Sequence, residues 1–173
     1  RVGRTQGDEQ VDITSQASVQ ALFEKIGPVD AIVSASGGLY FGPLATMKDS
    51  DFNQGLQDKL LGQVRLALTG QHYLNEGGSI TLISGIVAHE PIAQGVNATT
   101  VNAALEGFVR AAACELPRGI RINLISPTVL TESVDTYDGF FPGFESVPAA
   151  TVAQAYRRSV EGVQTGRVYK VGY

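Results

Sequence analysis

The sequence has few of the features that mark several classes of protein. Its 173 residues include one cysteine, Cys114, so no internal disulfide can form. So few cysteines favour a cytoplasmic protein. No run of about 18 apolar residues occurs, so we do not expect a membrane span. The 13 Lys and Arg residues against 17 Asp and Glu residues give a net charge of −4. Because no basic patch is present, we do not expect nucleic acid as a partner.

Signatures of other catalytic classes are also missing. No Gly-x-Ser-x-Gly elbow occurs, which argues against a hydrolase of similar layered architecture. The two histidines, His72 and His89, lack the Cys or carboxylate spacing of a metal site, so no metal is expected. There are no internal repeats. The length suits one domain over residues 1–173, which would bury about 70% of its unfolded surface.

The stretch 78–116 is the most informative part of the chain. Ser79–Ser84 is short, apolar and rich in β-branched residues, which is typical of a strand buried in a parallel sheet. A long helix follows and ends at Pro117. Its apolar stripe has helical spacing and consists of Val101, Leu105, Phe108, Val109 and Ala112.

Further elements are predicted on both sides of this stretch. We expect strands at 9–14, 29–34, 119–125 and 165–171, and helices over 19–26, 56–71 and 147–163. Strands that alternate with helices in this way favour an α/β fold.

The order strand, loop, Ala-rich helix, strand resembles that of the short-chain dehydrogenase/reductase family, most specifically over Asn102–Pro127. The resemblance covers nearly the whole chain. It implies a doubly wound parallel sheet of the Rossmann-like, three-layer kind, with NADP as cofactor and a carbonyl or alcohol as substrate. It also implies that about 30 residues, with the first strand and a Gly-rich turn over the pyrophosphate, belong before Arg1.

The catalytic positions depart from the family pattern. Where the family has a Tyr and, one helical turn later, a Lys, this chain has Ala98 and Asn102. Gly85 occupies the position of the family's catalytic Ser, and Ser84 lies one residue before that position. The place of the family's Asn on the preceding helix holds Lys59, which is either a solvated surface residue or an inward-facing one. We therefore take Ser84, Lys59 and Asn102 as the catalytic candidates, and expect Lys59 to stand in for the missing helix Lys.

The adenosine end of the cofactor is expected near the start of the chain. By resemblance, Arg4 lies where the ribose is read, and an Arg there suits the 2′-phosphate of NADP. Asp12 and Ile13 resemble the adenine contact of the family. The simpler alternative is that Arg4 is a surface residue, and that Asp12 and its neighbours Thr14 and Ser15 are helix-capping residues.

Small residues mark the rest of the expected cofactor site. Ala35, Ser36 and Gly37 follow a strand at its carboxyl end, where the backbone of an open α/β sheet can approach a ligand. Pro127, Thr128 and Thr131 occupy the family's carboxamide-binding segment. Downstream, Tyr137, Phe140, Phe141 and Phe144 could line an apolar pocket or pin a lid, and the sequence leaves both open.

The sequence thus predicts an NADP-dependent oxidoreductase. The alternative is a catalytically silent nucleotide-binding or redox-sensing protein that kept the fold. His89 is foremost a loop residue, with a proton donor as the second possibility. By resemblance, the two long helices pair subunits into a homodimer or homotetramer.

Overall fold

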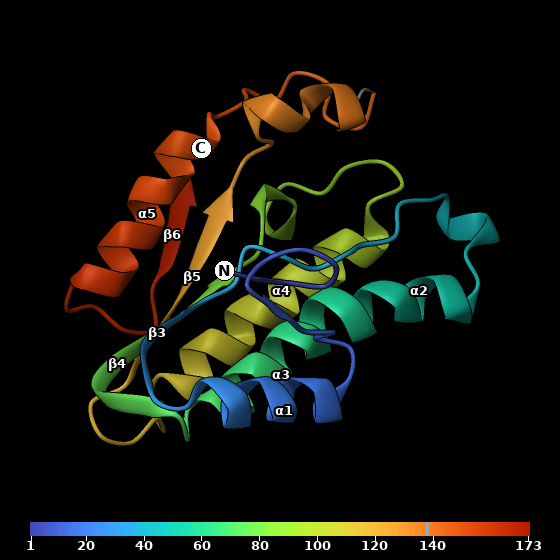
Figure 1. Ribbon diagram of the computed structural model, residues 1–173. Helices are drawn as coiled ribbons and strands as arrows, with labels where there is room; N and C mark the ends of the chain where they lie inside the picture. The colour runs from blue at the N-terminus through green and yellow to red at the C-terminus, as the bar shows by residue number, and fades with distance from the viewer. Residues whose placement is uncertain (138) are drawn as a thin grey trace.

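The computed structural model describes residues 1–137 and 139–173 and has helices on both faces of a parallel sheet (Figure 1). The predicted α/β class is confirmed. Four strands form the main sheet in the order β3-β4-β5-β6, and β1 and β2 form a separate parallel pair. In chain order the elements are β1 (Val2–Gly3), β2 (Glu9–Gln10), α1 (Gln16–Ile26), β3 (Val29–Val33), η1 (Leu44–Thr46), α2 (Asp49–Gly55), η2 (Leu56–Leu60), α3 (Leu61–Gly70), β4 (Leu74–Ile83), η3 (Ile86–Ala88), α4 (Val96–Ala112), β5 (Arg121–Pro127), η4 (Thr131–Tyr137), α5 (Ala149–Glu161) and β6 (Val168–Val171).

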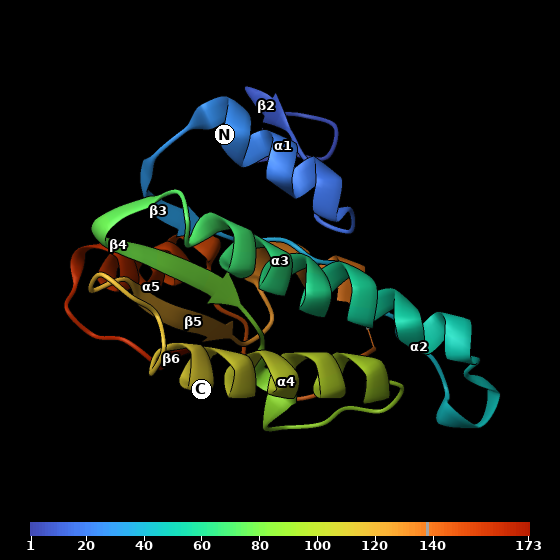
Figure 2. The same ribbon diagram turned by 90° about the horizontal axis from the view of Figure 1, so that it is seen from below.

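The two faces of the sheet are covered unequally. Helices α1, α3 and α4 lie side by side on one face, and α5 covers the other face (Figure 2). The central strands β4 and β5 are therefore buried from both sides, as the apolar run Ser79–Ser84 predicted for β4.

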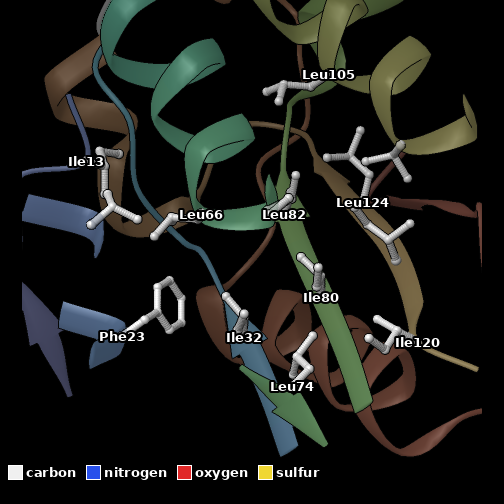
Figure 3. Close-up of a cluster of buried hydrophobic side chains, with 14 of the residues drawn as sticks. Ile13, Phe23, Ile32, Leu66, Leu74, Ile80, Leu82, Leu105, Ile120 and Leu124 are labelled. Carbon is white, nitrogen blue, oxygen red and sulfur yellow. The ribbon is translucent and has the colours of Figure 1, made fainter. Parts of the chain in front are cut away.

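The main core lies between the sheet and the helices α1, α3 and α4 (Figure 3). Val101, Leu105 and Val109 of the predicted stripe are fully buried against it. Each such side chain stabilises the fold by about 1.5–3 kcal/mol relative to an exposed one. The other labelled members in Figure 3, from the sheet, from α1 and α3 and from two connecting segments, are Ile13, Phe23, Ile32, Leu66, Leu74, Ile80, Leu82, Ile120 and Leu124.

Several predicted boundaries are wrong, and the reasons are local. The strand expected over 9–14 stops at Gln10, because the Asp12 carboxylate accepts the Thr14 amide at 2.9 Å and turns the chain. Ser15 then caps α1 by accepting the amide of Ser18. The helix expected over 56–71 contains a π-helical turn, η2, before α3. Strand β4 begins earlier than predicted, at Leu74.

A cavity of about 640 Å³ separates the β1–β2 pair from β3. Apolar side chains of β1, α1 and β3 line it, and the segment 34–38 borders it where β3 ends. In the described part of the chain, β3 pairs only with β4, so its other edge faces this cavity. Among the same residues, no helix combines the length and the apolar character needed to cross a membrane.

Candidate active site

The candidate site lies where β3 and β4 end. Both strands run parallel and deliver their following loops, 34–38 and 84–88, to the same edge of the sheet. Ligands of open α/β sheets bind at this edge. Helices α3 and α4 approach it from one face.

Lys59 comes to this edge from the π-helical turn η2. Its side chain is only 8% exposed, and its Nζ donates a hydrogen bond to the carbonyl oxygen of Ser84 at 3.2 Å. Burial lowers the pKa of Lys59 to about 8. In residues 1–137 and 139–173 we find no ion pair that includes Lys59. Of the two orientations that the sequence left open, the structure shows the inward one.

Gln63, one turn after Lys59, fastens η2 to the end of β4. Its Oε1 accepts the Ile83 amide at 2.8 Å, and its Nε2 donates to the Ile83 carbonyl at 2.9 Å and to the Lys59 carbonyl at 3.2 Å. The amide therefore fixes the position of Lys59 relative to Ser84. Sequence reasoning missed Gln63, because nothing in a helical pattern shows that an amide pairs with a strand.

Ser84 and Asn102 complete the buried polar cluster. They are 3% and 1% exposed, and Asn102 Nδ2 donates to the carbonyl of Ala98 at 2.8 Å. A Cβ placed on Gly85 would lie 3.9 Å from Asn102 Nδ2, so Lys59 and Asn102 meet at the Ser84–Gly85 peptide. Among the described residues, Ser84 Oγ and Asn102 Oδ1 have no hydrogen-bond partner. Buried polar atoms left unpaired in this way often belong to functional sites.

Ala98 lies under an apolar cover. It is fully buried in a cluster with Ile86 and Val87, and Phe141 and Phe144 are packed against that cluster. The rings of Phe141 and Phe144 are 5.4 Å apart, edge to face. The aromatic residues of this segment thus pack on one another and on the loop after β4, which favours the role of pinning a lid. Asp138 lies outside the described residues.

Arg4 and Asp12, both expected at the adenosine end, are adjacent in the structure. The Arg4 guanidinium lies 3.2 Å from the Asp12 carboxylate and 3.8 Å from that of Asp58. Hydrogen bonds from the side chain and backbone of Thr14, together with Arg4, lower the pKa of Asp12. Arg4 is exposed and borders the large cavity. Ile13 also borders this cavity, although it is buried and belongs to the core.

Ala35, Ser36 and Gly37 border the same cavity. Gly37 has a φ of 128°, and a Cβ placed there would lie 2.7 Å from the Cα of Lys59. Only glycine therefore allows this loop to lie directly over Lys59. The loop thus joins the cavity to the buried cluster.

The residues predicted to bind the carboxamide are engaged elsewhere. Pro127 ends β5, and the hydroxyl of Thr128 donates to the Glu145 carbonyl at 2.8 Å. The Thr131 hydroxyl donates to Ser146 Oγ at 3.1 Å. Both threonine side chains therefore hold the segment before α5, and no contact in the described residues brings them to Lys59.

A second buried polar group escaped the sequence analysis. Glu106 on α4, with a side chain 5% exposed, lies 2.7 Å from His89 Nε2 and 2.6 Å from the Arg110 guanidinium. The spacing of Glu106 and Arg110, four residues apart on a helix, was the available signal. No group of His, Cys, Asp or Glu suited to a metal ion is found in the described residues.

Comparison with known proteins places this geometry in context. A family model described as Enoyl-(Acyl carrier protein) reductase matches residues 3–165. Hydroxynaphthalene reductase arp2 of Aspergillus fumigatus is 29% identical over 131 residues, which cover 73% of this chain and 48% of the relative. The short-chain reductase protein NovJ of Streptomyces niveus is 33% identical over 77% of this chain and 53% of the relative. The chain thus spans about half the length of these curated relatives.

This chain covers a larger share of two proteins of known structure than of the curated relatives. The protein lin1944 from Listeria innocua is 47% identical, with a TM-score of 0.96, over 98% of this chain and 84% of that one. A small-chain dehydrogenase in complex with NADPH is 25% identical, with a TM-score of 0.84, over 98% of this chain and 94% of that one.

Proposed function

Because this chain belongs to the short-chain dehydrogenase/reductase family, we propose that it transfers a hydride between a nicotinamide cofactor, NADP, and a carbonyl or alcohol substrate. The observation that carries the proposal is the buried cluster of Lys59, Ser84 and Asn102 at the sheet edge where ligands bind. In the part of the chain that the structure describes, Lys59 has no counter-ion, so its desolvation costs stability. Such groups are concentrated at functional sites.

The residues present fit a dinucleotide at both of its ends. Arg4, with Asp12 beside it, would hold the adenosine, and Ala35–Gly37 would lie along its path. Ser84 Oγ and Asn102 Oδ1, which have no partner in the described residues, would bind polar groups at the nicotinamide end. The described residues include no Gly-rich turn for the pyrophosphate. When bound, the nicotinamide supplies or accepts the hydride.

NADP is favoured over NAD for two reasons. Arg4 lies at the end of β1 and is exposed toward the cavity, where a 2′-phosphate could replace Asp12 as its partner. Exposed ion pairs such as Arg4–Asp12 contribute only about 0–1 kcal/mol, so the exchange is inexpensive. The related dehydrogenase solved with NADPH supports the same choice.

A second candidate function is a silent nucleotide-binding protein of this fold. The specific observation in its favour is Ala98, which has no acidic hydrogen and is fully buried in an apolar cluster against which Phe141 and Phe144 pack.

The two candidates are separated by titrating the complete protein with NADPH and then adding a panel of aldehydes and ketones. Hydride transfer predicts that NADPH binds saturably and is then oxidised in the presence of at least one carbonyl compound. Binding without oxidation by any of them would favour the silent protein. Absence of binding would contradict both.

We further propose that the protein is cytoplasmic and acts as a homodimer or homotetramer. The outer side of α4 carries the small exposed residues Ala103, Gly107 and Ala111, which would allow close approach of a second subunit. Light scattering on the protein and on Gly107→Glu tests the pairing, because a charge at this contact would lower the measured mass.

A further inference from the structure

We propose that the Lys59 ammonium is itself the proton donor to the substrate oxygen. The inference rests on the proposed hydride transfer and assigns the acid that this reaction requires. Carbonyl reduction needs a proton at the oxygen as the hydride reaches the carbon. The place of the family's Tyr holds Ala98, which has no proton to give.

In the described residues the Lys59 ammonium keeps N–H donors that have no partner. It has three N–H donors, and in the described residues one is used, toward the Ser84 carbonyl at 3.2 Å. The neighbouring Ser84 Oγ and Asn102 Oδ1 are buried without partners, so the cluster has unused polar capacity for a substrate oxygen or a bridging water. The π-helical turn and the Gln63 amide fix the stem. Single π-helical turns inside helices occur frequently at functional sites.

Two other candidate donors are tyrosine hydroxyls with partners, and a third, His89, lies beside a carboxylate. The Tyr156 hydroxyl donates to the Ser34 carbonyl at 2.8 Å, and burial raises its pKa. The Tyr173 hydroxyl lies 2.6 Å from Ser126 Oγ, and burial also raises its pKa. His89 has its Nε2 turned to Glu106 at 2.7 Å. Both tyrosines are thereby weaker acids than usual, and His89 is directed at a carboxylate.

The electrostatic surroundings of Lys59 suit an acid that must release its proton. Among the described residues, the polar groups near it are Ser84 after β4 and Asn102 on α4, and both are neutral, as is Gln63, whose amide donates to the Lys59 carbonyl. The neighbouring carboxylate, Asp58, is directed toward Arg4 at 3.8 Å. Burial lowers the pKa of Lys59 to about 8, close to the pH at which a general acid works well.

In the proposed step, a hydride and a proton reach the two atoms of the carbonyl group. A hydride leaves the dihydronicotinamide and forms a C–H bond at the carbonyl carbon, so NADPH is oxidised and the carbonyl is reduced. An N–H bond of Lys59 breaks, and its proton forms the O–H bond of the alcohol. The neutral Lys59 amine then regains a proton from water. In the reverse direction the neutral amine is the base.

Two variants test the role. Lys59→Arg keeps a charge that is not released at neutral pH, and Lys59→Met removes the charge but keeps an unbranched stem. Lys48→Met is the control, because Lys48 is exposed at the start of α2. In single-turnover reduction of an accepted carbonyl, both Lys59 variants should be slower by 10²–10⁴-fold or more. The control should keep its rate, and NADPH should still bind to all three.

A readout without cofactor accompanies the kinetics. The reactivity of the Lys59 amine toward trace acetic anhydride, measured by mass spectrometry across pH, should show half-protonation near the value of about 8. Lys48 serves as the internal reference. Half-protonation at the ordinary lysine value of about 10.5 would overturn the proposal, since the ammonium would then be an ordinary solvated one.

The two levels of inference fail differently. If Lys59→Met or Lys59→Arg keeps the rate of the unaltered protein, Lys59 is not the donor, and the proposed function stands. If the unaltered protein and Lys48→Met oxidise NADPH with no carbonyl, the proposed function fails and the donor fails with it.

Discussion

Replacing Lys59 by Met should make the protein more stable at neutral pH. Lys59 is 8% exposed, and in the described residues no carboxylate pairs with its ammonium, so the charge is desolvated without compensation. Met fills a similar volume without charge. The variant is more stable because the desolvation penalty of the ammonium is removed.

The magnitude follows from the lowered pKa. The pKa of Lys59 falls from 10.5 in the unfolded chain to about 8 in the folded protein. Each pKa unit corresponds to a free-energy difference of about 1.4 kcal/mol. Desolvation therefore costs about 3 kcal/mol below pH 8. Loss of the hydrogen bond to Ser84 returns about 1 kcal/mol, which leaves a net gain of about 2 kcal/mol for Lys59→Met.

The sign of the pH dependence is fixed by linkage. Between about pH 8 and pH 10.5 the unfolded chain holds a proton on Lys59 that the folded protein has released. Stability of the parent protein therefore rises with pH in this window, and the advantage of Lys59→Met shrinks. Below pH 8, Lys59 is protonated in both the folded and the unfolded protein, so the full desolvation penalty lowers the stability of the folded state.

Urea unfolding of the parent and Lys59→Met at pH 7 and pH 10 measures this difference, with Lys48→Met as control. Subtracting the parent at each pH removes the titration of other groups. A variant no more stable than the parent at pH 7, or a difference that stays constant with pH, would refute the claim that the ammonium is desolvated.

Three further predictions follow from the site and the core. Arg4→Ala should weaken the binding of NADPH by about 1.5–3 kcal/mol and leave the binding of NADH nearly unchanged, because two charge-assisted hydrogen bonds to the 2′-phosphate are lost. Equal weakening of the binding of both cofactors in calorimetric titrations would show that Arg4 is only a surface residue. Gly37→Ala should lower both stability and NADPH affinity, because its Cβ would lie 2.7 Å from Lys59 Cα at a φ of 128°; unaltered urea midpoint and affinity would contradict this packing. Leu105→Ala should cost about 2–5 kcal/mol in urea unfolding, as for other fully buried leucines; a loss below 1 kcal/mol would mean that this core position is poorly packed.

Much of the fold could be predicted, because its central elements are defined by local pattern. The burial of β4 and β5 follows from apolar runs, and that of α4 follows from the stripe that includes Val101, Leu105 and Val109. The end of β2 and the start of β4 were missed. Each depends on where the chain turns, which a few side-chain hydrogen bonds decide and apolar periodicity does not report.

The site was predictable only in part. Position alone indicated that Ser84, Lys59 and Asn102 converge, and the structure brings Lys59 and Asn102 to the Ser84–Gly85 peptide. The role of the Gln63 amide was not predictable, because it depends on a contact between residues 20 apart in the sequence. The π-helical turn was not predictable because apolar periodicity does not report a single turn of this kind. The contact of Lys59 with a carbonyl rather than a carboxylate also comes from the tertiary fold.

The most direct test of the account follows the hydride itself. The complete protein is incubated with NADPH deuterated at the transferred position of C4 and with the carbonyl that best stimulates NADPH oxidation. The account predicts an alcohol with one deuterium at the former carbonyl carbon, at a rate that Lys59→Met lowers by 10²-fold or more. NADPH that binds tightly while no tested carbonyl acquires deuterium would contradict it and identify a silent nucleotide-binding protein.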